Sequence, residues 1–192
     1  MKKIFFIGFL VLGLVSLTGC FNQYAPPKKY ELTAVSRQQF AVHPTKTTLL
    51  VSQPVPILTY QSADMLYVNE HYQLAPFVKN TWSVPPAEML FPLMTQSLQN
   101  THYFSAVIPA PTFAYTDWRL DSHVMKLQQD FTHKPSIVVL ELDATLINNL
   151  TANVIANKQF YAQATAPSDT PYGGVIAANI ACQQVMDELS RW

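Results

Sequence analysis

The sequence predicts an α+β fold: a single compact domain whose mainly antiparallel sheet, a hairpin plus a three-strand meander, is packed by two helices. Apolar and polar residues alternate in consecutive segments between residues 120 and 164, as in half-buried strands. Apolar residues also recur at helical spacing in two places, the second of them C-terminal. About 170 residues follow the N-terminal segment, a length that suits one core.

The first predicted elements are short strands and a hairpin. We expect strands from Tyr30 to Ala34 and from Thr47 to Gln53. Pro54 and Pro56 should end the second strand, because proline lacks the amide hydrogen that a sheet needs. Residues 65–77 predict the hairpin, which has a turn at its centre.

A helix is predicted to follow the hairpin. Ser83 offers a side-chain cap, and Pro85 and Pro86 suit a first turn. Pro92 conflicts with this pattern, because a proline inside a helix removes one hydrogen bond and costs about 3 kcal/mol. We therefore expect a helix that starts late, near Glu88, or one that kinks at Pro92.

Three longer strands and a final helix complete the domain. Residues 120–127 alternate without a clear apolar face, which predicts a strand partly buried on each side. Residues 138–146 have the most regular alternation, and residues 154–164 form the third strand of an antiparallel meander. The final helix has one apolar stripe, which should pack on the sheet. The stripe comprises Val175, Ala178, Cys182, Val185, Met186 and Leu189.

The N-terminus indicates export and lipidation. Lys2 and Lys3 precede a short apolar stretch, which is the layout of a secretory signal. The junction from Leu17 to Cys20 resembles a bacterial lipobox, whose cysteine becomes a diacylated and N-acylated N-terminus. An ordinary secretory signal with an incidental cysteine is the alternative.

These features predict three segments. We expect residues 1–19 to be a lipoprotein signal peptide, residues 20–29 a lipidated tether and residues 30–192 a single domain. If Cys20 carries lipid, Cys182 has no partner for an internal disulfide. A small buried hydrophobe is the simplest interpretation of Cys182, and an intermolecular disulfide or a reactive thiol is the alternative.

Composition and spacing argue against several classes of ligand. Removal of residues 1–19 leaves ten basic and twelve acidic residues without a basic cluster, so we expect no nucleic acid partner. The five histidines lack the spacing of a metal site, and the adjacent Gly173 and Gly174 form no phosphate-binding loop. We expect no metal and no cofactor other than the covalent lipid on Cys20.

The sequence also offers little catalytic chemistry. Asp121, Ser122 and His123 are the residue types of a triad, but neighbours on a strand point to opposite faces. Glu141 and Asp143 share a strand face and could divide acid and base roles, although a solvated sheet face is the commoner explanation for such a pair. We predict no catalytic residue, and we keep an envelope hydrolase that uses this carboxylate pair as an alternative.

A stretch rich in aromatic residues and methionine has two interpretations. These side chains could belong to the core, or they could form a contact surface, because such residues are enriched where proteins dock. The candidate partner-binding residues are Tyr60, Met65, Tyr67 and Trp82.

Taken in order, these features resemble the ABC-type transport auxiliary lipoprotein family. The resemblance rests on the lipobox, Tyr30-Glu31-Leu32, a strand that ends at Pro54-Val55-Pro56, the Tyr60 to Trp82 region and the meander with its terminal helix. It implies a non-enzymatic adaptor at the inner face of the outer membrane that links MCE-domain and ABC transporter components in lipid transport. It also allows a homo-oligomeric ring. Phe21 follows Cys20 where an aspartate would signal inner-membrane retention, which favours the outer membrane.

One further alternative remains open. The domain could itself carry a lipid or another apolar ligand in a dry cavity. Phe77, Leu90 and Phe160 are the residues that we expect to line such a cavity.

Overall fold

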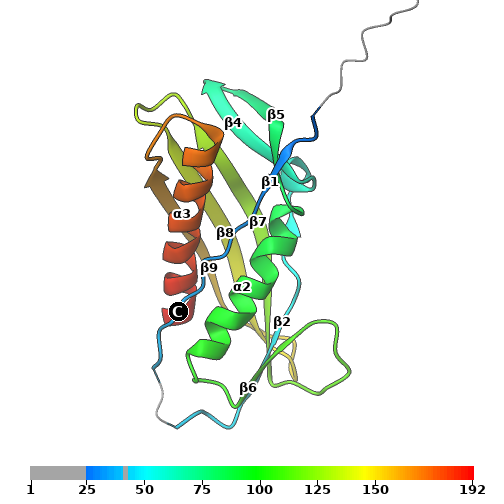
Figure 1. The fold of residues 1–192 in the computed structure, drawn as a ribbon. Helices are drawn as coiled ribbons and strands as arrows, with labels where there is room; N and C mark the ends of the chain where they lie inside the picture. Colours follow the sequence, from blue (N-terminus) through cyan, green and yellow to red (C-terminus); the bar gives the residue numbers. More distant parts are fainter. Residues whose placement is uncertain (1–24, 41–42) are drawn as a thin grey trace, which may run out of the picture.

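Two helices lie on one face of a curled sheet in the computed structural model, which describes residues 25–40 and 43–192 (Figure 1). The helices are α2 (Pro86–Asn100) and α3 (Pro171–Arg191). The predicted signal peptide and Cys20 lie outside the described residues. Among the helices that are described, none is both long and apolar enough to cross a membrane.

Strand β7 (Trp118–Asp130) organises the sheet because it is long enough to pair along both edges. It runs antiparallel to β8 (Ile137–Asn148) on one edge. Along the other edge lie β2 (Thr48–Val51), β3 (Val55–Pro56) and β4 (Asp64–Glu70), one after another and all parallel to β7.

The remaining strands extend the sheet outward. Strand β9 (Val154–Thr165) pairs antiparallel with β8, and β5 (Gln73–Trp82) pairs antiparallel with β4. Strands β1 (Lys28–Tyr30) and β6 (Ala106–Pro109) lie parallel to β5 and β2. A short 3-10 helix, η2 (Leu58–Tyr60), connects β3 to β4.

The predicted fold class is confirmed, with the hairpin as β4–β5 and the meander as β7–β8–β9. The parallel pairings and β6 were not predicted. Pro54 interrupts pairing but does not end it, because Ser52 N donates to Leu120 O on one side and Ile57 N to Val124 O on the other. Strand β2 therefore ends before Pro54, as expected, but the renewed pairing with β7 at β3 was not predicted.

A β-bulge corrects the expectation for the first meander strand. The pairing of β7 with β8 shifts register between Val124 and Lys126. This shift returns Leu127 to the face of Leu120 and Val124, and all three are almost fully buried. The strand therefore has one buried face instead of two partly buried ones.

Helix α2 begins earlier than expected. Its first residue is Pro86, and its N-cap, Pro85, makes no side-chain capping bond, so the predicted cap at Ser83 is not formed. Pro92 lies inside the helix on an exposed position. The carbonyl of Glu88, which Pro92 leaves without a helical partner, also belongs to an exposed residue, so water can satisfy it.

Residues 31–38 do not continue the first strand as predicted, and instead form a segment that we call the strap. It runs between the two helices, α2 and α3, and contacts both of them (Figure 1). Asn179 Oδ1 accepts from Thr33 N at 2.8 Å, and Ser97 Oγ accepts from Ser36 N at 2.9 Å. Gln183 Nε2 donates to Val35 O at 3.0 Å. The polar face of α3 therefore holds the strap.

The core lies between the sheet and the helices. Every residue of the predicted α3 stripe is buried, including Cys182. Phe160 on β9 and Leu142 on β8 are fully buried and are paired across the two strands. Thr170 caps α3 by accepting from Gly173 N at 3.0 Å.

Candidate functional site

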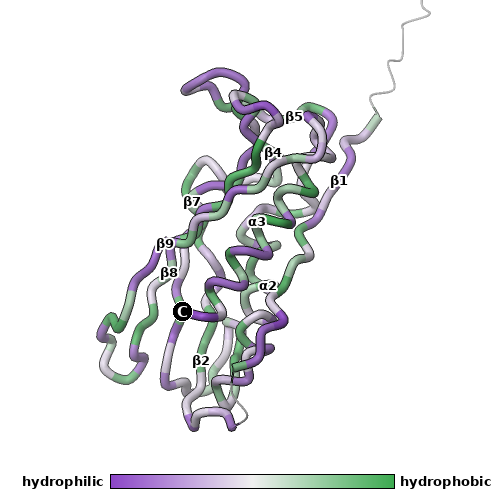
Figure 2. The backbone as a smooth tube through the Cα atoms, turned by 90° about the vertical axis from the view of Figure 1, so that its left-hand side faces the viewer, coloured by the Kyte–Doolittle hydropathy of each residue, from purple (hydrophilic) through white to green (hydrophobic). Residues whose placement is uncertain are grey.

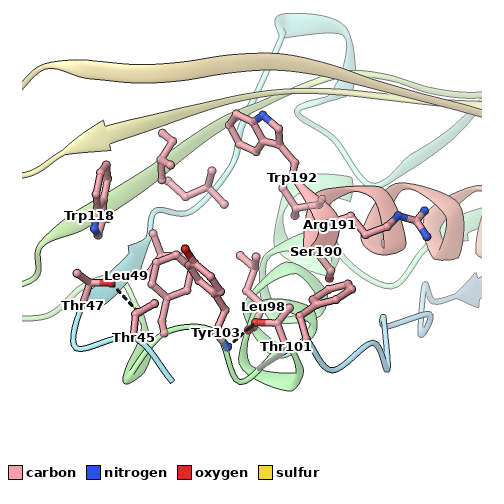
Figure 3. Close-up of a pocket in the computed structure, with 15 residues that line it drawn as sticks. Thr45, Thr47, Leu49, Leu98, Thr101, Tyr103, Trp118, Ser190, Arg191 and Trp192 are labelled. Atoms are coloured by element: carbon pink, nitrogen blue, oxygen red, sulfur yellow. Dashed lines mark hydrogen bonds between the residues drawn. The ribbon is translucent and has the colours of Figure 1, made fainter. Parts of the chain in front are cut away.

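A cavity of about 550 Å³ opens at the end of the sheet where β2, β7 and β8 meet the last turns of α2 and α3 (Figure 3). Three strands, both helices and two connecting segments contribute to its wall. The residues that line it are Phe40, Thr45, Thr47, Leu49, Leu98, Thr101, Tyr103, Phe104, Trp118, Leu120, Leu146, Leu189, Ser190, Arg191 and Trp192.

The threonine hydroxyls of this wall already have partners. Thr45 and Thr47 share a hydroxyl hydrogen bond of 2.8 Å. Thr101 Oγ1 donates to Leu98 O at 2.6 Å and accepts from Tyr103 N at 3.2 Å. Because these hydroxyls are engaged and most of the other lining side chains are leucine or aromatic, the cavity presents a mainly apolar surface.

Aromatic rings form much of the rim. Tyr103 packs edge-on against Phe104, with ring centroids 5.1 Å apart. Trp192 packs edge-on against the buried Phe160 at 5.6 Å, while 39% of the Trp192 surface stays exposed. The C-terminal residue is thus held against the core and also faces the cavity (Figure 3).

The carboxylate of Asp117 holds together β2 and β7, the two strands that form the floor of the cavity. Asp117 Oδ2 accepts from both the amide and the hydroxyl of Thr48 at 2.8 Å. These hydrogen bonds hold the pKa of Asp117 below its usual range, because they stabilise the charged form. They align the start of β2 with the start of β7, which brings Leu49 beside Trp118.

The predicted partner-binding residues lie elsewhere, and most are inaccessible. Tyr60, Met65 and Trp82 are each only 4% exposed. Tyr67 is half-buried in an aromatic cluster, 4.5 Å from Phe77 and 5.8 Å from Phe131 between ring centroids. In the chain by itself, Tyr67 is therefore the one of the four that a partner could contact readily, and its role in binding stays a prediction.

The expected carrier residues do not line the cavity. Leu90 and Phe160 are fully buried in the core, and Phe77 belongs to the aromatic cluster on the hairpin. The residues that do line it were missed because they come from distant parts of the sequence. An alternating pattern marks Leu120 and Leu146 as inward-facing, but no local signal distinguishes a residue beside a cavity from one in a filled core.

The carboxylate pair lies on the sheet face opposite the helices. Glu141 forms an ion pair with Lys126 at 3.3 Å and accepts from Gln159 Nε2 at 2.7 Å. Asp143 has one buried oxygen without a hydrogen-bond partner among the described residues. Neither residue lines the cavity, and the described part of the chain contains no group of three potential metal ligands.

The triad residue types point apart, as predicted. Ser122 is buried beside Met94, whereas His123 is exposed on the other face. Asp121 accepts instead from Arg119 at 3.0 Å and from Ser52 at 2.6 Å. A proton relay among these three residues is therefore not formed.

Two buried groups that ionise at high pH, a thiol and a phenolic hydroxyl, should make the stability of the fold decrease in alkaline solution. Burial raises the pKa of the Cys182 thiol from 9.0 to about 12 and that of the Tyr60 hydroxyl from 10.0 to about 12. The unfolded chain therefore loses protons above about pH 9 that the folded chain retains, so the free energy of unfolding should fall between about pH 9 and 12. Below about pH 9 this stabilisation is fully present.

Urea denaturation at about pH 8 and about pH 11 measures this decline. Cys182→Ala and Tyr60→Phe should each reduce the decline, because each removes one of the two groups. Tyr161→Phe, at an exposed position on β9, serves as the control and should leave the decline unchanged. A decline of equal size in all four proteins would contradict the assignment.

Comparison with known proteins defines the class. A family model described as the ABC-type transport auxiliary lipoprotein component matches residues 30–190. The chain therefore belongs to this family of auxiliary lipoproteins of ABC-type transport systems. No curated protein shows significant sequence similarity to it.

Solved structures share the fold. The chain is similar to protein XCC0632 from Xanthomonas campestris, with a TM-score of 0.76 and 21% identity over 85% of this chain and 92% of that one. The structure of an uncharacterized protein is similar with a TM-score of 0.68 and 15% identity, over 87% of this chain and 98% of that one. The hypothetical protein CT253 from Chlamydia trachomatis is similar with a TM-score of 0.53 and 6% identity, over 77% of this chain and 95% of that one. At these identities the likeness concerns the fold alone.

Proposed function

We propose that this protein is an outer-membrane lipoprotein that links an MCE-domain protein and its ABC transporter to the membrane in lipid transport. The family match over residues 30–190 carries the proposal. Two sequence features support the location. Cys20 closes a lipobox, and Phe21 follows it in place of the aspartate that would retain the protein at the inner membrane.

A surface suited to a partner lies at the end that carries the cavity. The loop before β7 and the turn between β8 and β9 are joined there, because Asn149 N donates to Asp117 O at 2.9 Å and Asn149 Nδ2 to Thr116 Oγ1 at 3.0 Å. Figure 2 shows hydrophobic stretches at this turn. Exposed apolar residues gather on these segments, which we call the apolar end. They are Phe113, Tyr115, Leu150 and Val154.

The apolar end faces away from the point where the described chain enters the fold. Tyr30 on β1 contacts Tyr172 at the start of α3, with ring centroids 6.1 Å apart. Helix α3 then spans 21 residues to the cavity, roughly 30 Å. A domain tethered at β1 could thus present its apolar end outward, and exposed apolar patches typically mark binding surfaces. We assign the MCE-domain protein to this surface.

Affinity capture of the full-length lipoprotein from solubilised envelopes tests the proposal. We expect the wild type to recover an MCE-domain protein and transporter components. The double variant Phe113→Ser, Tyr115→Ser should recover about tenfold less, because it removes the apolar contact. Tyr172→Ser, which alters an exposed aromatic residue at the other end, should recover wild-type amounts.

Two results would contradict parts of the proposal. Recovery of neither component by the wild type would exclude the adaptor function. Equal recovery by wild type and the double variant would instead exclude the apolar end as the contact surface.

A further inference from the structure

We propose that the cavity is a binding site for a single lipid acyl chain, recognised by its hydrocarbon and not by its headgroup. This inference goes beyond the adaptor function, because it gives the domain a ligand of its own. It rests on the lining, volume and position of the cavity.

The volume and lining suit a hydrocarbon chain. About 550 Å³ falls within the range of roughly 300–1,000 Å³ that is typical of small-molecule sites. Leucine side chains from β2, α2, β8 and α3 face the space, namely Leu49, Leu98, Leu146 and Leu189. Each methylene group that moves from water into such surroundings contributes about 0.8 kcal/mol.

We expect the wall not to select a headgroup. The threonine hydroxyls are engaged with one another or with the backbone, as described above. Arg191 is the one cationic residue among those lining the cavity, and Figure 3 shows its guanidinium group directed away from the two indole rings. A headgroup would therefore remain outside, and the affinity should depend on chain length.

The mouth of the cavity adjoins exposed apolar surface. Phe40 and Tyr103 at the rim are each 50% exposed, and Trp118 leads directly from the loop that carries Phe113 and Tyr115. A chain could thus enter from the apolar end. Because this end lies roughly 30 Å from β1, the chain would come from a partner or an opposing lipid surface.

Tryptophan fluorescence can locate the ligand, because Trp118 and Trp192 line the cavity whereas Trp82 is buried at the end of the hairpin strand β5. The protein is residues 20–192 with Cys20→Ser, which prevents acylation. The probe is stearic acid brominated at mid-chain, kept below its micelle concentration, since bromine quenches indole at short range. We expect saturable quenching, with one probe per chain in native mass spectrometry.

The variant Trp118→Phe, Trp192→Phe retains Trp82 alone, which lies outside the cavity, so the probe should leave its fluorescence unquenched. Quenching of Trp82 to the same extent would show unspecific binding and overturn the proposal. Failure to reach saturation, or the absence of a one-to-one complex, would also overturn it.

A cavity-filling variant tests the site directly. Leu146→Phe should weaken probe binding about tenfold, because the larger ring occupies the space. Ile155→Phe makes a similar change at an exposed position on the neighbouring strand and should bind within about twofold of the parent. Equal weakening by both variants, or by neither, would exclude this cavity.

A series of unbrominated fatty acids, competed against the probe, tests recognition of the chain. Each added methylene should tighten binding about fourfold until the cavity is full. The matching fatty alcohols should bind within about threefold of the acids. A loss of affinity above that factor would show that a headgroup is recognised and would overturn this part of the proposal. These measurements need no transport partner, so their failure would leave the adaptor function standing.

Discussion

Replacing Phe160 with alanine should lower the free energy of unfolding by about 3–5 kcal/mol. The ring is fully buried and lies opposite Leu142 across the β8–β9 pair. Trp192 packs edge-on against it, and Lys158 Nζ lies 5.2 Å from its centroid. Alanine would leave a void between the sheet and α3, because neighbours in a packed sheet relax only in part.

Urea denaturation of the two proteins at neutral pH measures this loss. Tyr161→Ala is the matched control, because Tyr161 is the next residue on β9 and is exposed on the other face. It should change the free energy of unfolding by no more than about 0.5 kcal/mol. If both variants lost the same amount, the assigned faces of β9 would be wrong.

Replacing Cys20 with alanine should abolish membrane attachment. The predicted lipobox would place diacylglycerol on the thiol of Cys20 and a further acyl chain on its amino group, and each buried methylene contributes about 0.8 kcal/mol to anchoring. Without the thiol no lipid can be attached, and lipobox processing should stop. We expect loss of labelling by radioactive palmitate and loss of the mature lipidated form from the outer membrane fraction.

Two variants separate anchoring from other effects. Cys182→Ala keeps the lipobox and should be labelled like the wild type, because Cys182 is buried in the domain. Phe21→Asp should remain labelled but move to the inner membrane, since it changes the sorting residue alone. Palmitate labelling of Cys20→Ala would refute lipidation at this position, and an unchanged location of Phe21→Asp would refute the sorting assignment.

The secondary-structure elements that could be predicted are those whose apolar and polar residues form a regular pattern within the element itself. Strand β8 is flanked by β7 and β9, and Leu140, Leu142 and Ala144 are buried on the expected face while Glu141 and Asp143 lie on the other. Strand β7 was mispredicted because its bulge at residues 124–126 changes the phase of the alternation. Such a shift depends on pairing with β8, which the β7 segment by itself does not encode.

Long-range pairing with β7 also determines how the chain continues after the two prolines. Pro54 and Pro56 have the local properties of a strand end, yet the chain pairs again at β3 because β7 continues beside it. Asn179 and Gln183 on α3 resemble solvent-facing residues, but they bind the strap, which approaches from more than a hundred residues earlier.

The expected destination of the protein and most of its secondary structure were predicted from short stretches of the sequence. A lipobox is recognised in an extended chain, and alternation along a strand needs only its own residues. The tertiary structure alone decided which aromatic residues are accessible and where the cavity lies. Leu49, Leu98, Trp118, Leu146 and Trp192 meet only after folding. Exposure is set by what packs against a side chain, and here those neighbours come from distant strands and helices.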